Sequence, residues 1–221
     1  MDPVALWSYL HILLFVFWLG TDVGVFTAAI FLKNPTYSFE TRLVLIKLLS
    51  IVDIFPRLCF ALIFPVGLHL TRALEIYQIS DAFLATAWIV GVSWCVAIFV
   101  MMRNESKPIG KLLAKLQVWF EGVLGLFFVA VGGVSLATGA PLAANWYAGK
   151  ILLFGFVFWA AIALHILFKP FEQPFMAIGE HGSTPEREAA VTAAINRALK
   201  GVMCLYILIA VIAFLGTVKP F

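Results

Sequence analysis

Six long apolar segments follow one another along the chain, separated by short polar or proline-containing connections. They predict helices at about residues 4–32, 41–74, 82–102, 110–138, 144–169 and 186–217. A helix needs about 20 predominantly apolar residues to cross the hydrocarbon core of a bilayer, and each segment is long enough. Pro185 and Glu186 are typical of a helix start, and they mark the beginning of the last segment. The pattern predicts an all-α, polytopic membrane helix bundle with about six transmembrane helices.

The composition supports a membrane protein. Of the 221 residues, 63% are hydrophobic and only 12% are charged, and the mean hydropathy is +1.02. A chain with so few charges cannot cover itself with polar surface, so lipid must act as its solvent. The six helices leave no room for a separate soluble domain, and we expect one integral membrane domain over residues 1–221. A net charge of +3 is too small to indicate a nucleic-acid partner.

The distribution of lysine and arginine predicts the orientation. With six spans, both termini share one side with the loops near 75–82 and 139–144, and that side carries only Arg72 and Lys219 outside the spans. The opposite side collects Lys33, Arg42, Arg103, Lys107, Lys111, Lys115, Lys169, Arg187, Arg197 and Lys200. The positive-inside rule makes this second side cytoplasmic. Both termini then lie on the non-cytoplasmic side, and the predicted location is the cytoplasmic (inner) membrane of a bacterium.

The first apolar segment carries three unusual side chains, His11, Trp18 and Asp22. A helix turns about 100° per residue, so offsets of seven and eleven return almost to the starting direction and the three residues form one stripe. An ionisable group at membrane depth is costly and usually marks a site. We interpret the stripe as facing the interior of the bundle, with His11 as a ligand of a metal, the iron of a haem.

Further nitrogen-bearing side chains share the predicted outer leaflet with His11. His69 lies near the outer end of the second segment, and Lys150 opens the fifth. Two histidines on different helices at similar depth suit the axial ligation of haem iron, and Lys150 and Arg72 are suited to bind carboxylates. The plainer alternatives are hydrogen bonds between helices for the histidines and snorkelling to the interface for Lys150. His181, in a connector, is expected to be solvated.

A second polar set lies in the middle and inner half of the predicted membrane. Asp53 and Arg57 have the i,i+4 spacing of an ion pair, and Asp22 and Glu121 lie on other helices. Buried charges are usually paired, so a structural ion-pair network is the plain interpretation. A proton route to the outer site and a metal site formed by His165, Glu121 and Asp22 are the alternatives.

Four short motifs follow one another along the chain: Leu10-His11-Ile12 with Phe17-Trp18-Leu19-Gly20, Pro56 followed by an apolar run to Gly67, Trp146 with Lys150, and the ending Val218-Lys219-Pro220-Phe221. Together and in this order they resemble the HemJ family, bacterial membrane proteins assigned to protoporphyrinogen IX oxidation. The family typically has four helices, whereas this chain has two additional predicted spans near 82–138. The CopD type is a more distant resemblance, although the clustered methionines and histidines of a copper route are missing.

The resemblance implies a b-type haem bound through His11 and a functional basic residue at Lys150. We therefore expect a haem b-binding membrane oxidoreductase that oxidises protoporphyrinogen IX or another lipophilic donor and passes electrons to quinone. The expected roles are iron ligation by His11 and His69, a haem-site contact for Trp18, carboxylate binding by Lys150 and Arg72, and proton relay by Asp22, Asp53, Arg57 or Glu121. The alternatives are a b-type cytochrome that only carries electrons, a subunit of a membrane complex, and an ion or metal transporter. A homo-oligomer is left open.

Overall fold

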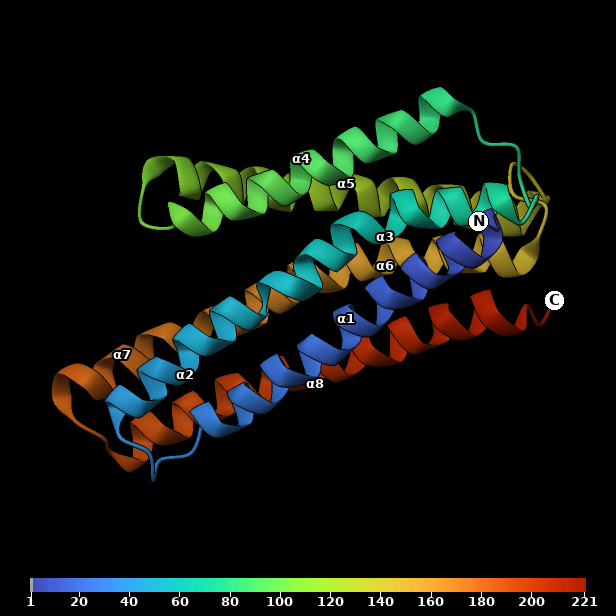
Figure 1. Ribbon diagram of the computed structural model, residues 1–221. Helices are drawn as coiled ribbons and strands as arrows, with labels where there is room; N and C mark the ends of the chain where they lie inside the picture. Colours follow the sequence, from blue (N-terminus) through green and yellow to red (C-terminus); the bar gives the residue numbers. More distant parts are fainter. Residues whose placement is uncertain (1) are drawn as a thin grey trace. The chain divides into compact units, whose positions relative to one another are not determined.

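The computed structural model describes residues 2–221 and is all-α over that range, with 86% of the chain helical and no strands. Eight α-helices and one short 3-10 helix follow one another (Figure 1). They are α1 (Pro3–Leu32), α2 (Phe39–Val52), α3 (Ile54–Ala73), α4 (Asp81–Arg103), α5 (Pro108–Thr138), α6 (Asn145–Phe168), η1 (Lys169–Phe171), α7 (Glu172–His181) and α8 (Pro185–Val218).

The predicted all-α bundle is confirmed, and five of the six predicted segments correspond to α1, α4, α5, α6 and α8 within a few residues. Five helical segments are long and apolar enough to cross a membrane, the fourth of them running through α6 to the end of α7. The chain is therefore a multi-pass membrane protein whose helices contact the lipid bilayer.

The predicted helix over 41–74 is divided into α2 and α3 at Asp53, so its continuity was wrong. Pro56 explains the break. A proline has no backbone N–H to donate to the carbonyl four residues earlier, here that of Val52, and its ring crowds the same carbonyl. The helix resumes at Ile54 and continues through the buried Pro65. α3 is not among the five spans identified by length and composition. It packs against α1 and α4, and both of these helices are among the five.

The connector expected before the last helix is itself mostly helical. The short η1 leads into α7, whose Phe175 and Ile178 are buried and which packs on α8. The Phe39 ring contacts this helix too, at a centroid distance of 5.0 Å from the Phe175 ring. The sequence contained a signal of this helix, because the i,i+3 spacing of Phe175 and Ile178 is typical of an amphipathic helix.

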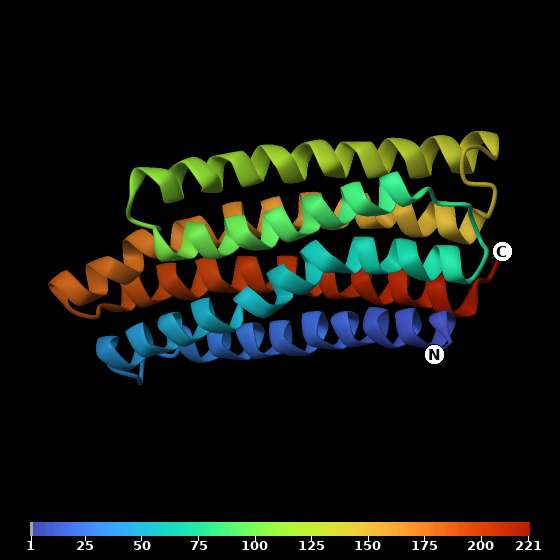
Figure 2. The same cartoon turned by 45° about the horizontal axis from the view of Figure 1, so that its top comes forward.

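The helices group into two compact units by their contacts. Unit 1 comprises the chain up to Leu32 together with Glu40–Leu113, and unit 2 comprises Lys33–Phe39 with Ala114–Phe221. In unit 1, α3 runs antiparallel to α1, as both ribbon views show (Figures 1 and 2). Its core includes an aromatic chain in which Phe60 lies 5.0 Å from Trp18 and 5.2 Å from Trp94 between ring centroids.

Unit 2 is held by α6, which packs against α8 and approaches α5 closely. A Cβ added at Gly155 would lie only 2.7 Å from the backbone nitrogen of Val129, so this contact requires glycine. Small residues allow membrane helices to approach in this way, which increases van der Waals contact where the hydrophobic effect gives no help. Trp159 Nε1 donates to the Gly122 carbonyl at 3.3 Å and joins the same two helices by a hydrogen bond.

Arg42 has a structural role that its place in the sequence did not indicate. From the sequence it is one of the basic residues that mark the predicted cytoplasmic side, but its side chain is only 1% exposed. Its Nε donates a hydrogen bond of 2.7 Å to the carbonyl of Leu32, the last residue of α1. The final carbonyls of a helix have no partner within the helix and carry partial negative charge. The Arg42 guanidinium therefore caps α1.

We predict that Arg42→Met lowers the free energy of unfolding by about 1.5–3 kcal/mol, since a charged hydrogen bond to a buried helix end is lost. The matched control is Lys47→Met on the same helix, because Lys47 is exposed. Thermal unfolding of the two purified variants in one non-ionic detergent provides the comparison. Equal loss of stability in both variants would contradict the capping role.

Candidate functional site

A pocket of about 640 Å³ opens in unit 1, at the end that carries the start of α1 and the α3–α4 connection. Its lining comes from α1, α3 and α4 and includes Trp7, His69, Arg72, Asp81 and Trp88. We call it the unit 1 pocket. Its volume lies in the range of sites that hold small molecules and cofactors, about 300–1,000 Å³. Aromatic walls with a few polar groups are also typical of such sites.

His69 is the imidazole of this pocket. Its ring stacks on that of Trp7, with centroids 4.0 Å apart and planes inclined by 9°, and Trp88 lies 6.2 Å away at 50°. Stacking covers the face of an imidazole, whereas a metal binds a ring nitrogen at its edge. The Trp7 contact is therefore compatible with a ligand role for His69.

The cationic group of the pocket is Arg72, one turn after His69 on α3. Its guanidinium forms an ion pair with Asp81 in the first turn of α4, so it joins the end of α3 to the start of α4. Ser80 caps α4 by accepting a hydrogen bond from the Phe83 backbone N–H at 3.3 Å. A guanidinium has five N–H donors, and the pair with Asp81 leaves some of them for a carboxylate of a ligand.

His11 lies one turn after Trp7 on α1, in the interface with α3. A Cβ added at Gly67 of α3 would lie 3.1 Å from Cε1 of the His11 ring, so glycine allows the imidazole to contact the α3 backbone. The structure thus places His11 and His69 in the same α1–α3 interface. They differ in access, because His69 lines the unit 1 pocket and His11 does not. Trp18 is buried in the aromatic core and is not a pocket residue either.

Lys150 belongs to unit 2, on the first turns of α6. Its Nζ lies against α8, where a Cβ added at Gly216 would be 2.8 Å away. At the end of α8, Lys219 Nζ lies over the ring of Trp146, 5.2 Å from its centroid, within the range of a cation–π contact. The ends of α6 and α8 therefore bring two lysines and a tryptophan together.

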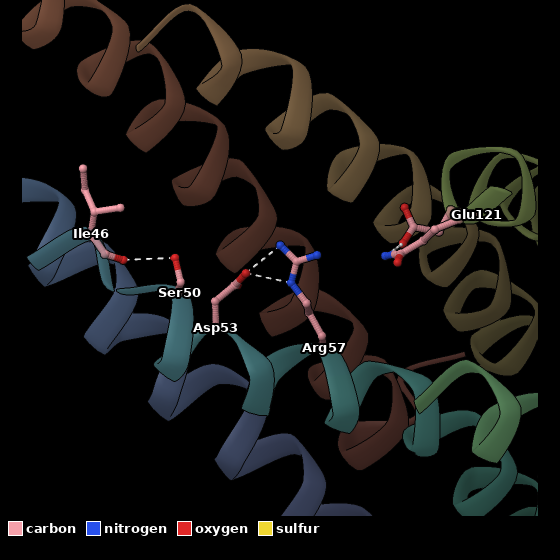
Figure 3. A network of polar contacts seen from close by, with 6 residues as sticks. Ile46, Ser50, Asp53, Arg57 and Glu121 are labelled. Carbon is pink, nitrogen blue, oxygen red and sulfur yellow. Dashed lines mark hydrogen bonds and ion pairs between the residues drawn. The ribbon is translucent and has the colours of Figure 1, made fainter. Parts of the chain in front are cut away.

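The predicted Asp53–Arg57 ion pair is confirmed. Arg57 donates to Asp53 Oδ2 from Nε at 2.7 Å and from Nη2 at 2.6 Å, across the junction of α2 and α3 (Figure 3). One turn earlier, Ser50 Oγ donates to the Ile46 carbonyl at 3.0 Å. The side chains of Asp53 and Arg57 are 26% and 41% exposed within the protein. This local pairing accounts for both charges without a catalytic role.

The remaining polar residues are placed on separate helices. Glu121 of α5 is buried and accepts a hydrogen bond of 2.8 Å from Gln117 Nε2. Asp22 is half-buried on α1, and His165 and His181 are exposed. Over residues 2–221, no group of three or more His, Cys, Asp or Glu side chains could hold a metal ion. Of the residues proposed for the alternative metal site, Asp22 belongs to unit 1, whereas Glu121 and His165 belong to unit 2.

The sequence reasoning missed Trp7, Trp88 and Lys219 as site residues. Trp7 could have been found, because it precedes the candidate ligand His11 by four positions and so shares its helix face, as Trp146 does with Lys150. Trp88 follows from no sequence pattern, since its role depends on how α4 packs against α3. Lys219 was recognised as a charge outside the spans and as part of the ending motif, but its contact with Trp146 was not predicted.

We predict that Trp7→Leu increases the rate at which diethyl pyrocarbonate modifies His69 several-fold, because the ring that covers the imidazole is removed. Peptide mass spectrometry of the modified protein measures the rate at each histidine. The matched control is Trp146→Leu, which removes the equivalent tryptophan of unit 2. A His69 rate that is unchanged in Trp7→Leu, or raised equally in the control, would contradict the stacking.

No protein-family model, curated protein or solved structure matches this chain.

Proposed function

We propose that this membrane protein binds haem b through unit 1 and acts as an oxidoreductase on a lipophilic donor, as the resemblance to the HemJ family implies. The observation that carries the proposal is the unit 1 pocket, in which an imidazole, a guanidinium and two tryptophans meet. The imidazole suits iron, the guanidinium suits a propionate, and the indole rings suit the flat faces of a macrocycle.

The residues that would hold the haem fit it in chemical type. His69 offers a nitrogen edge beside the stacked Trp7, and His11 is the second candidate ligand in the same interface. Arg72 keeps donors for a carboxylate while its pair with Asp81 holds the side chain across the α3–α4 connection. Bound haem would supply a one-electron redox centre within the membrane.

The protein's own groups would contribute binding, orientation and proton movement. Trp7 and Trp88 would exclude water from one side of the pocket, and Arg72 would fix the orientation of a ligand by its carboxylate. We keep Asp22 and Glu121 as candidate proton carriers, with Glu121 held by Gln117. Asp53 and Arg57 have a weaker case, because each is already the other's partner. Lys150 remains a candidate carboxylate-binding residue, in unit 2.

The proposed location is the inner membrane of a bacterium, with both termini on the non-cytoplasmic side. The distribution of the basic residues supports this orientation. Of those assigned to the cytoplasmic side, only Arg42 is buried within the protein. The unit 1 pocket, at the end of unit 1 that includes the start of α1, would then open toward the outer face. A lipophilic donor such as a reduced porphyrin, and quinone as acceptor, would reach it from the bilayer.

We predict that the purified protein shows a Soret band that shifts on dithionite reduction, and that His69→Ala and His11→Ala lose most of it. His181→Ala is the matched control, because His181 is an exposed residue. The ratio of Soret to protein absorbance measures haem content in the three variants. Absence of the band from the wild type would remove the proposal and favour the transporter alternative, whereas equal haem content in all variants would remove His11 and His69 as ligands.

Rescue of a porphyrin-accumulating bacterial strain separates the enzyme from an electron carrier. The wild-type chain should restore haem synthesis in such a strain if it oxidises protoporphyrinogen IX. A pigmented protein that never rescues the strain would favour a cytochrome or a subunit of a membrane complex.

A further inference from the structure

Two stretches of the chain, one in each unit, share a sequence repeat. Residues 7–17 read WSYLHILLFVF and residues 146–156 read WYAGKILLFGF. Six of these eleven positions are identical, and the basic residue, His11 or Lys150, occupies the same place in both. The first stretch opens α1 and the second opens α6.

The helices that follow the repeat have the same order in both units. α1 is followed by the short α2 and by the returning helix α3, and α6 is followed by the short α7 and by the returning helix α8. α1 packs on α3, and α6 packs on α8. Each unit thus contains a long helix, a short helix and an antiparallel partner (Figure 2).

Equivalent residues also have equivalent neighbours. The basic residue of the repeat faces a glycine of the returning helix, since a Cβ at Gly67 would meet the His11 ring and one at Gly216 would meet Lys150. The tryptophan of the repeat meets a basic residue of the returning helix, with Trp7 stacked on His69 and Lys219 over Trp146. Sequence, helix order and contacts therefore agree that one framework occurs twice.

The two copies differ in the charge they present. The two basic positions of unit 1, His11 and His69, hold imidazoles, which can be neutral. The corresponding positions of unit 2, Lys150 and Lys219, hold ammonium groups, which repel one another. Lys150 is half-buried. Within the part of the chain that the structure describes, neither ammonium is hydrogen-bonded or paired with a carboxylate. Lys219 is exposed, so it can reach a ligand from solvent, and an anion placed between the two ammonium groups would offset their repulsion.

We infer that the ends of α6 and α8 form an anion site in which Lys150 and Lys219 bind the charged head of an amphipathic ligand, a carboxylate or a phosphate group. Trp146 and the surrounding apolar helices contact the ligand's hydrocarbon part. The inference rests on the proposed carboxylate-binding role of Lys150 and extends it to a second residue and to ligands other than haem. A fatty-acid carboxylate and a phospholipid headgroup are the two sources of this chemistry.

The test uses the full-length purified protein in a non-ionic detergent, and neither readout depends on iron ligation in unit 1. Isothermal titration with laurate measures carboxylate binding, and native mass spectrometry after reconstitution with phosphatidylglycerol or phosphatidylcholine measures lipid retention. Lys150→Met and Lys219→Gln should each weaken binding about ten-fold or more, because a charged hydrogen bond is lost. Lys150→Arg should retain most of it.

Two further variants separate the site from general effects of charge and folding. Lys200→Met removes a lysine from α8 outside the site and should leave binding unchanged. Gly216→Ala keeps both charges but displaces Lys150 Nζ, so it should weaken binding, whereas Gly67→Ala, at the equivalent position of unit 1, should not. Thermal unfolding verifies that each variant is folded.

Each outcome is decisive. Lysine-dependent binding of laurate identifies a carboxylate ligand, and lysine-dependent retention of phosphatidylglycerol but not phosphatidylcholine identifies a headgroup. The inference is overturned if neither probe binds, or if Lys200→Met has the same effect as Lys150→Met. Loss of haem binding in unit 1 with intact anion binding would refute the proposed function alone.

Discussion

Close contact between antiparallel helices at glycine is the constraint on which the rest of the structure depends. In a bilayer the hydrophobic effect does not drive helices together, so packing and interhelical polar contacts must do so. Gly67 and Gly216 each allow a polar side chain to reach the backbone of the neighbouring helix. The same residues thus determine the helix spacing and the location of the polar groups, which is why the candidate sites lie beside the α1–α3 and α6–α8 interfaces.

Polar groups inside the apolar segments are held by near neighbours. Asp53 pairs with Arg57 one turn away, and Glu121 accepts a hydrogen bond from Gln117 on the same helix. Such local pairs satisfy a polar group before tertiary packing forms, which reduces the cost of burying it. His69 differs, because its main contacts are the aromatic rings of other helices. This difference favours His69 over the Asp53–Arg57 pair as a functional group.

Helix positions followed from the sequence because apolar runs bounded by proline, glycine and charge leave little choice in a bilayer. The break at Asp53 was harder to place, because Pro56 disturbs the helix ahead of its own position. It has no N–H to donate to the carbonyl of Val52, four residues earlier. The i,i+4 pairing of Asp53 with Arg57 was predictable since it depends on one helix alone. The pocket was not, because the meeting of His69 with Trp7 and Trp88 depends on three helices, and facing across the proline-containing α3 cannot be computed from an ideal rotation.

Arg42 illustrates how one side chain can serve insertion and folding by different atoms. Its charge contributes to the choice of membrane side, for which any cation would do. Its planar donor geometry holds the last carbonyl of α1, for which an ammonium on a flexible stem is a poorer substitute. A lysine at this position would therefore preserve the positive charge that influences how the chain threads the bilayer, while leaving the first helix free to fray at its C-terminal end. Topology and rigidity can be altered independently here.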